Sequence, residues 1–133
     1  MNCIVVTPEK TVLDQETTFV ALPLFDGEIG IGKGHTPLVG RLGAGELRVS
    51  CTDGKVLYYY VEGGFVEVLD DGVVLMTTHA WPASMLNVDV AEKQLQDALA
   101  RPGNTLELSQ IREKKVNARR ARLRLAQKMA SEK

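Results

Sequence analysis

The chain has 133 residues, of which 44% are hydrophobic and 25% charged, and its formal net charge is −1. This length fits one domain, or one domain with a small appendage, and the hydrophobic fraction is ordinary for a globular protein. No apolar run approaches the roughly 20 residues that a membrane-spanning helix needs, and the first residues lack the basic region of a secretory signal. We therefore expect no direct insertion into a membrane.

The charges are distributed unevenly along the chain. Residues 1–108 carry seven Lys/Arg and fifteen Asp/Glu, a net charge of −8, whereas residues 109–133 carry nine Lys/Arg and two Asp/Glu, a net charge of +7. Such a polarity indicates that the C-terminal segment has a role of its own, toward an acidic surface or an anionic partner.

The first 81 residues have the pattern of short strands separated by Gly, Pro and Asp. Residues 27–38 predict a short strand that enters a tight turn, because glycine supplies the dihedral angles that other residues avoid. Asp53-Gly54 is a hairpin signal, and Asp70-Asp71-Gly72 is a second turn. Turns about every ten residues are typical of an all-β sandwich or barrel. The other expected strands are residues 4–6, 17–24, 47–52, 56–61, 65–69 and 73–76.

The pattern changes after Trp81-Pro82-Ala83-Ser84, which we expect to be a short linker with His79 before it. The predicted domains are therefore a β-sandwich over residues 1–84 and an antiparallel helical hairpin over residues 85–133.

Two helices are expected in the hairpin. Asn87 or Asp89 is the candidate cap of the first, and Pro102-Gly103-Asn104 ends it; Thr105 or Ser109 is the candidate cap of the second. The apolar positions at helical spacing are Val88, Ala91, Leu95, Ala98 and Leu99 in the first helix, and Leu108, Ile111, Ala118, Leu125 and Met129 in the second.

No motif for catalysis or for metal binding is present. His35 has neither a nucleophile nor a second ligand at a recognisable spacing, and the glycine-rich segment lacks the P-loop pattern. Cys3 and Cys51 lie in apolar segments and are expected to be buried, reduced thiols.

The basic C-terminal helix has several interpretations: nucleic acid, a membrane surface, an acidic protein face, or solvent alone. The helix lacks aromatic residues for base stacking, which disfavours nucleic acid. Its basic residues are Arg112, Lys114, Lys115, Arg119, Arg120, Arg122, Arg124 and Lys128.

Three motifs, taken in their order along the chain, resemble those of a known protein family. They are Gly27-Glu28-Ile29-Gly30-Ile31 with His35, Pro37 and Leu38, then the segment 60–68 around Gly63-Gly64, and then the segment 73–80. In these motifs, and in the order of sandwich, linker and hairpin, the chain resembles the epsilon subunit of bacterial F-type ATP synthases. Ala44 is a departure, since relatives commonly carry Pro there.

The resemblance implies a non-catalytic central-stalk subunit that couples the gamma subunit to the c-ring, on the cytoplasmic face of the inner membrane. It places the c-ring and gamma interface at Gly27, Glu28, Ile29, Gly30, Ile31, His35 and Pro37. It also implies that the C-terminal helix restrains ATP hydrolysis by contacting acidic segments of the catalytic beta (and alpha) subunits. The residues expected to make that contact are Arg112, Lys115, Arg119, Arg120, Arg122 and Arg124.

Some relatives of that family bind ATP at the start of the first helix of the hairpin. Asp89 matches their motif, but Glu92 replaces its arginine and would repel phosphate. Arg119 and Arg122 are the candidates to compensate, and we expect no bound cofactor. The alternative function is an independent β-sandwich binding module with a helical oligomerisation hairpin.

Overall fold

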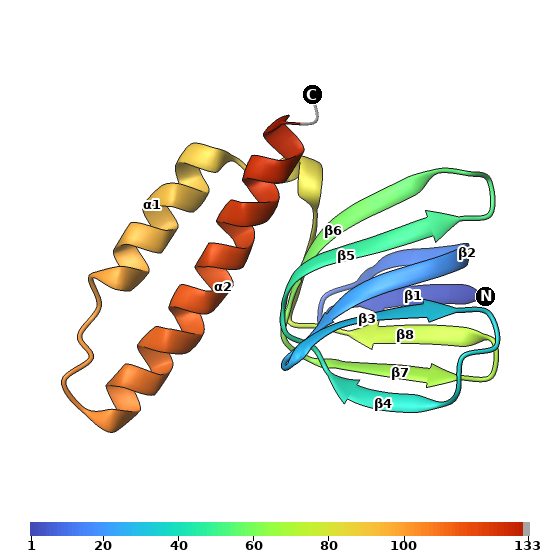
Figure 1. The fold of residues 1–133 in the computed structure, drawn as a ribbon, viewed down its shortest axis with the longest axis horizontal. Coiled ribbons are helices and arrows are strands. Elements are labelled where there is room, and N and C mark those ends of the chain that lie inside the picture. The colour runs from blue at the N-terminus through green and yellow to red at the C-terminus, as the bar shows by residue number, and fades with distance from the viewer. Residues whose placement is uncertain (132–133) are drawn as a thin grey trace. The chain divides into compact units, whose positions relative to one another are not determined.

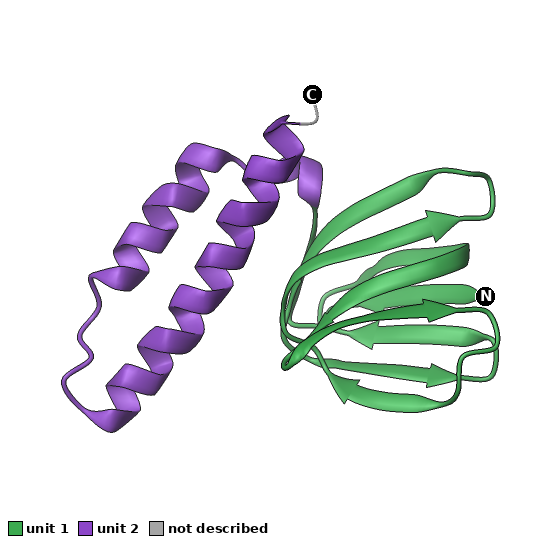
Figure 2. Cartoon of the chain, in the orientation of Figure 1, with its two compact units in different colours: residues 1–82 green, residues 83–133 purple. Residues whose placement is uncertain are grey.

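A computed structural model describes residues 1–131 and contains two compact units, Met1–Pro82 and Ala83–Lys133 (Figure 2). The first unit is built from strands only, and the second from helices (Figure 1). The expected fold class, an N-terminal β-sandwich followed by a two-helix hairpin, is confirmed. The boundary between the units falls two residues before the expected one, and residues 132–133 of the expected hairpin domain lie outside the described part.

Nine strands form the first unit, in two sheets that share the long strand β2. In one sheet the strand order is β4-β7-β8-β1-β2, and in the other it is β3-β2-β5-β6-β9. All neighbours are antiparallel except β1 and β8, which are parallel. The strands are β1 (Asn2–Val6), β2 (Thr11–Leu24), β3 (Gly27–Gly32), β4 (Leu38–Arg41), β5 (Ala44–Cys51), β6 (Val56–Glu62), β7 (Phe65–Leu69), β8 (Gly72–Met76) and β9 (His79–Pro82).

Strand β2 changes sheet along its length. Its first part pairs with β1 up to Glu16, and its second part pairs with β3 and β5 from Thr17 onward. The register with β5 shifts between Thr17 and Phe19, as in a β-bulge, which bends a strand and increases its local twist. The Thr17 hydroxyl is buried and donates to the Met1 carbonyl oxygen at 2.9 Å, so the bend is tied to the start of the chain.

The core of the sandwich lies between the inner faces of the two sheets. Buried residues alternate with exposed ones in β7 and with half-buried or exposed ones in β8, as the pleat of a strand with one face in the core requires. The buried apolar residues of this core are Cys3, Val5, Leu13, Val20, Leu22, Ile31, Leu42, Leu47, Val49, Cys51, Val61, Val66, Val68, Val73, Leu75 and Ala80.

The expected linker at residues 81–84 is a wrong prediction, and so is the linker position of His79. Residues His79–Pro82 form the edge strand β9, which pairs with β6 so that Trp81 faces Tyr60. The Trp81 ring stacks on Tyr60 at a centroid distance of 5.7 Å and on His79 at 5.3 Å. Pro82 suggested a break in the chain, but an edge strand tolerates proline because one side of its backbone needs no partner.

Both cysteines are buried free thiols, as expected. Burial raises the pKa of the Cys3 thiol from 9.0 to about 12, with smaller contributions from Cys51 and Asp14. A pKa that is higher in the folded state favours the protonated thiol, so its contribution to stability is present below about pH 9 and is lost toward pH 12.

The sandwich is therefore expected to lose stability in denaturant titrations between about pH 9 and pH 12. The matched variant is Cys3→Ala, whose stability should decline less over the same interval. Equal declines for the two proteins would contradict the contribution of Cys3.

The second unit begins with a short 3-10 turn (Ala83–Met85), followed by α1 (Val88–Leu99) and α2 (Leu106–Ser131). Of the candidate caps, Asn87 accepts a hydrogen bond from the Val90 amide at 3.1 Å, and Thr105 accepts one from the Leu108 amide at 3.1 Å. At 1.5 Å per residue, α1 is about 18 Å long and α2 about 39 Å.

The apolar seam between the helices is narrow. Leu95, Ala98 and Val116 are buried there, with Leu99 and Leu123 packed against them. The stripe expected on α2 is wrong at its start, because Leu108 and Ile111 are exposed. α2 extends beyond the end of α1, so its first turns have no α1 residue opposite them.

Candidate functional site

The glycine-rich segment forms β3, which pairs with β2, and the loop that follows β3. Ile29 packs against the core and Ile31 is fully buried, whereas Glu28 and Gly30 are exposed on the other face. Of the expected interface residues, Ile31 therefore serves packing and does not present its side chain at the surface.

The neighbouring ring of Phe19 leaves no room for a side chain at position 30. A Cβ atom at this position would lie 2.5 Å from Cζ of the Phe19 ring, so the ring covers the strand where the glycine leaves room. The result is an exposed face on which the Glu28 carboxylate lies beside an aromatic ring. At Gly27 nothing lies within 4 Å of the place where a Cβ would stand, so a partner is able to approach the main chain closely there.

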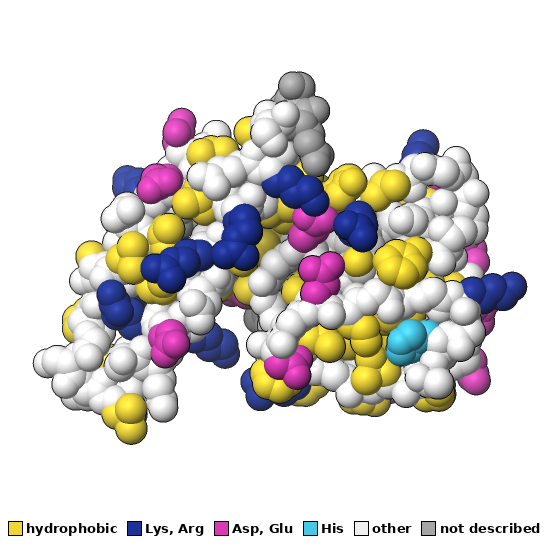
Figure 3. All heavy atoms as spheres, viewed as in Figure 1, with side chains coloured by type: hydrophobic (Ala, Val, Ile, Leu, Met, Phe, Trp, Pro, Cys, Tyr) yellow, Lys and Arg dark blue, Asp and Glu magenta, His cyan; other side chains and the backbone are white. Residues whose placement is uncertain are grey.

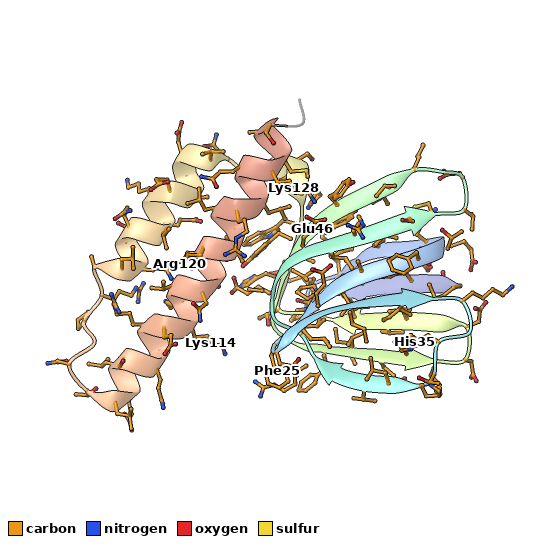
Figure 4. All side chains as sticks on the ribbon, in the orientation of Figure 1. Phe25, His35, Glu46, Lys114, Arg120 and Lys128 are labelled. Carbon is orange, nitrogen blue, oxygen red and sulfur yellow. The ribbon has the colours of Figure 1, made fainter. Side chains whose placement is uncertain are left out.

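The two ends of β3 are different sites. Phe25 precedes the strand and His35 follows it, and Figure 4 shows them at opposite ends of the sandwich. Six residues in an extended strand span about 20 Å. One compact contact therefore does not include both Glu28 and His35, although they are only seven residues apart in the sequence.

The end near Glu28 carries an aromatic and cationic pair that the sequence analysis did not single out. Phe25 is 65% exposed, and the Arg41 guanidinium carbon lies 5.4 Å from the centre of its ring. The Phe25 amide donates to the Arg41 carbonyl oxygen at 3.1 Å, which fixes the turn against β4. Val39, on the same strand as Arg41, is 72% exposed. The only sequence signal for this site is the turn Phe25-Asp26-Gly27.

The end with His35 is a tight loop held by its own backbone. The His35 amide donates to the Gly32 carbonyl oxygen at 3.2 Å, and His35 Nδ1 lies 2.7 Å from the Thr36 carbonyl oxygen. Gly34, at φ +82°, supplies the left-handed conformation that the turn requires. Pro37 is exposed beside it.

The six candidate regulatory residues do not form one surface. Arg120 and Arg124 are exposed, Arg112, Lys115 and Arg119 are half-buried, and Arg122 is buried with 6% of its surface accessible. Figure 3 shows the basic side chains that remain at the surface of the helical unit, and Figure 4 shows Lys114 and Arg120 on α2. In this conformation the outward-facing cations of α2 include Lys114, Arg120 and Arg124.

The candidates for ATP binding are not brought together. Asp89 lines a cavity of about 250 Å³ between the start of α1 and the end of α2, but Arg119 and Arg122 do not line it. The described lining contains no Lys or Arg to neutralise a phosphate. The lining residues are Ser84, Leu86, Asn87, Val88, Asp89, Ala126, Met129 and Ala130.

Within residues 1–131, no group of three His, Cys, Asp or Glu side chains is placed to hold a metal ion. None of the helices in this part of the chain is long and apolar enough to cross a membrane.

The fold and the charges define a class of two-domain protein, a β-sandwich followed by a helical hairpin whose second helix is basic. Residues 1–83 match the family model described as ATP synthase, Delta/Epsilon chain, beta-sandwich domain. The ATP synthase epsilon chain of Rhodopirellula baltica is 47% identical over 93% of this chain and 96% of its own length. That of Nitratidesulfovibrio vulgaris is 36% identical over 86% of this chain and 81% of its own length.

The chain belongs to the ATP synthase epsilon chain family. It is a structural or regulatory subunit and not a catalytic one. The fold is shared with a chain in the Euglena gracilis mitochondrial ATP synthase structure of OSCP, F1 and c-ring, with a TM-score of 0.80. The two chains are 24% identical, and the match covers 90% of this chain and 76% of that one. A chain in the central stalk and c-ring of the Tetrahymena thermophila mitochondrial enzyme gives a TM-score of 0.77 at 16% identity, covering 95% and 96%.

Proposed function

We propose that this chain is a central-stalk rotor subunit of a membrane-associated F-type ATP synthase. It couples the gamma subunit to the c-ring during ion-driven ATP synthesis, at the cytoplasmic face of the inner membrane. The observation that carries the proposal is the full-length similarity to curated epsilon chains, 47% identical over 93% of this chain. The two structures with the same fold come from assemblies that contain a c-ring.

The geometry of β3 supports two separate contacts. The end with Glu28, Gly27 and the Phe25–Arg41 pair is assigned to the polar loops of the c-ring. The end with His35 and Pro37 is assigned to the gamma subunit. A coupling subunit needs its two partner sites apart on one rigid body, and the opposite ends of a strand inside a packed sandwich meet that need.

The helical unit is assigned to the restraint of ATP hydrolysis. The exposed cations of α2, Lys114, Arg120 and Arg124, fit acidic segments of the catalytic beta (and alpha) subunits. The narrow apolar seam of the hairpin supports this role, because a pair of helices with little buried surface is able to separate at a low cost in free energy.

The test is the ATPase activity of the parent catalytic complex with the full chain and with a chain that ends at Ser84. Both should bind, because the sandwich has its own core, and only the full chain should slow hydrolysis, by several-fold. If both bind and neither slows hydrolysis, the proposed restraint of ATP hydrolysis is wrong and the coupling role remains. If neither binds, the independent binding module replaces the rotor subunit.

A further inference from the structure

A buried threonine lies where the turn between β6 and β7 meets the start of β9. Thr77 stands between β8 and β9 and is 3% exposed. Its hydroxyl oxygen is 2.8 Å from the Gly63 carbonyl oxygen, 3.2 Å from that of Glu62 and 3.1 Å from that of His79. A hydroxyl carries one hydrogen and donates to one carbonyl at a time, and the Gly63 contact is the shortest. The hydroxyl is therefore a donor that three main-chain carbonyl groups share.

The turn between β6 and β7 is bonded in its turn to the segment between β4 and β5. The Gly63 amide donates to the Gly43 carbonyl oxygen at 3.2 Å. The Leu42 amide donates to the Gly64 carbonyl oxygen at 2.9 Å. Both bonds join main-chain groups, so rotation of a side chain does not loosen them. The position of one segment therefore fixes the position of the other.

The segment between β4 and β5 holds the turn that precedes β3. The Gly43 amide donates to the Pro23 carbonyl oxygen at 3.1 Å, and a Cβ atom at Gly43 would lie 2.6 Å from the Leu24 carbonyl oxygen. The Phe25 amide donates to the Arg41 carbonyl oxygen at the end of β4. The turn that presents the aromatic and cationic pair is therefore held by main-chain contacts behind it.

We infer that Thr77 is a positioning residue for the contact assigned to the c-ring. Its hydroxyl fixes the turn between β6 and β7, which fixes residues 42–43, and these fix the turn at Phe25 and the start of β3 with Glu28. A contact whose backbone is ordered before binding loses less conformational entropy on binding, which raises its affinity. The rigidity of the turn rests on contacts within the sandwich alone, and the identity of the partner rests on the proposed function.

The rigidity is tested by amide hydrogen exchange on the full isolated chain. Thr77→Val keeps the shape of the side chain and removes the donor. It should raise the exchange rates of the Phe25 and Gly43 amides roughly tenfold relative to the amides of β1, because the loss of a buried hydrogen bond favours local opening. Thr77→Ser keeps the hydroxyl and should keep the wild-type ratio. The matched control is Thr17→Val, which removes another buried hydroxyl of the sandwich, bonded to Met1 outside this network, and should also keep the ratio.

A second variant keeps the test decisive if Thr77→Val does not fold. Thr77→Cys has nearly the shape of Thr77→Ser but only a weak donor, so its Phe25 and Gly43 amides should exchange faster than those of the serine variant. An unchanged ratio in Thr77→Val overturns the inference. Where the valine variant is unfolded, equal ratios in Thr77→Cys and Thr77→Ser overturn it instead.

The partner is tested with the full chain bound to the gamma subunit, by its affinity for purified c-rings. Thr77→Val should lower this affinity roughly tenfold and leave the affinity for gamma unchanged, because the gamma contact is assigned to the other end of β3. Thr77→Ser and Thr17→Val should keep the wild-type affinity for both partners.

The two readouts separate the inference from the proposed function. Equal losses of c-ring and gamma binding in Thr77→Val would overturn the positioning role, because a general loss of stability weakens both contacts. If the exchange ratio rises and the c-ring affinity does not change, Thr77 holds the turn and the assignment of that turn to the c-ring fails.

Discussion

Arg120→Glu with Arg124→Glu is expected to raise ATP hydrolysis by the assembled complex several-fold, to the level reached with a chain that ends at Ser84. Both side chains are exposed on α2, so charge reversal leaves the folded hairpin intact. An acidic partner that attracts arginine repels glutamate, and repulsion between like charges at an interface costs several kcal/mol. The measurement is steady-state hydrolysis by the reconstituted complex.

A matched control for this variant changes charge elsewhere in the same hairpin. Lys93→Glu reverses one exposed cation on α1, outside the surface assigned to the catalytic subunits, and should leave hydrolysis at the wild-type level. The effect of the double variant should also shrink at high salt, because exposed charges are screened. If the double variant still slows hydrolysis as the wild type does, the exposed arginines do not contribute to the restraint of ATP hydrolysis.

Gly64→Ala is expected to destabilise the sandwich by about 3 kcal/mol or more. Gly64 has φ +97°, and a Cβ atom there would overlap the Met76 carbonyl oxygen and lie 2.8 Å from the Thr77 Cα. Both neighbours are backbone atoms of β8 and the residue after it, so no side chain is able to rotate away. Denaturant unfolding followed through Trp81, the single tryptophan, reports on this unit because the ring stacks on Tyr60.

Gly54→Ala separates backbone strain from the steric clash. Gly54 has a similar dihedral angle, φ +90°, but nothing lies within 4 Å of the place where a Cβ would stand. Its substitution should cost only about 1–2 kcal/mol, the strain of a left-handed residue with a side chain. Equal losses in the two variants would mean that the clash at Gly64 is relieved by movement of β8.

Local signals were sufficient for much of the fold. Asp53-Gly54 and Asp70-Asp71-Gly72 marked two turns that the structure contains, and Asn87 and Thr105 are caps at the helix starts. The short strands β4 and β9 were not predicted. Gly40 interrupts the pattern in one and Pro82 in the other, and each strand exists because a neighbour in the sheet supplies its hydrogen bonds. Pairing of this kind is tertiary and leaves little trace in a local sequence window.

The candidate site was predictable as a segment but not as a surface. The motif at residues 27–38 identified the strand and loop, yet periodicity alone did not show that Ile31 is buried while Phe25 and Arg41 meet at one end. The basic helix was equally clear in composition. Its division into inward and outward arginines depends on where α1 lies, and on the carbonyl oxygen of Leu99, a backbone atom without any sequence signature that accepts from Arg112.

The passage of β2 from one sheet to the other has a mechanical consequence. In a sandwich whose sheets are joined only by loops, a shearing load is resisted mainly by side-chain packing between the layers. Here β2 is hydrogen-bonded into both layers, to β1 in one and to β3 and β5 in the other. Sliding one layer over the other would have to stretch a continuous covalent strand and break its ladder on both sides of Thr17. A torque applied at one end of β3 is therefore transmitted to the other end with little deformation of the sandwich.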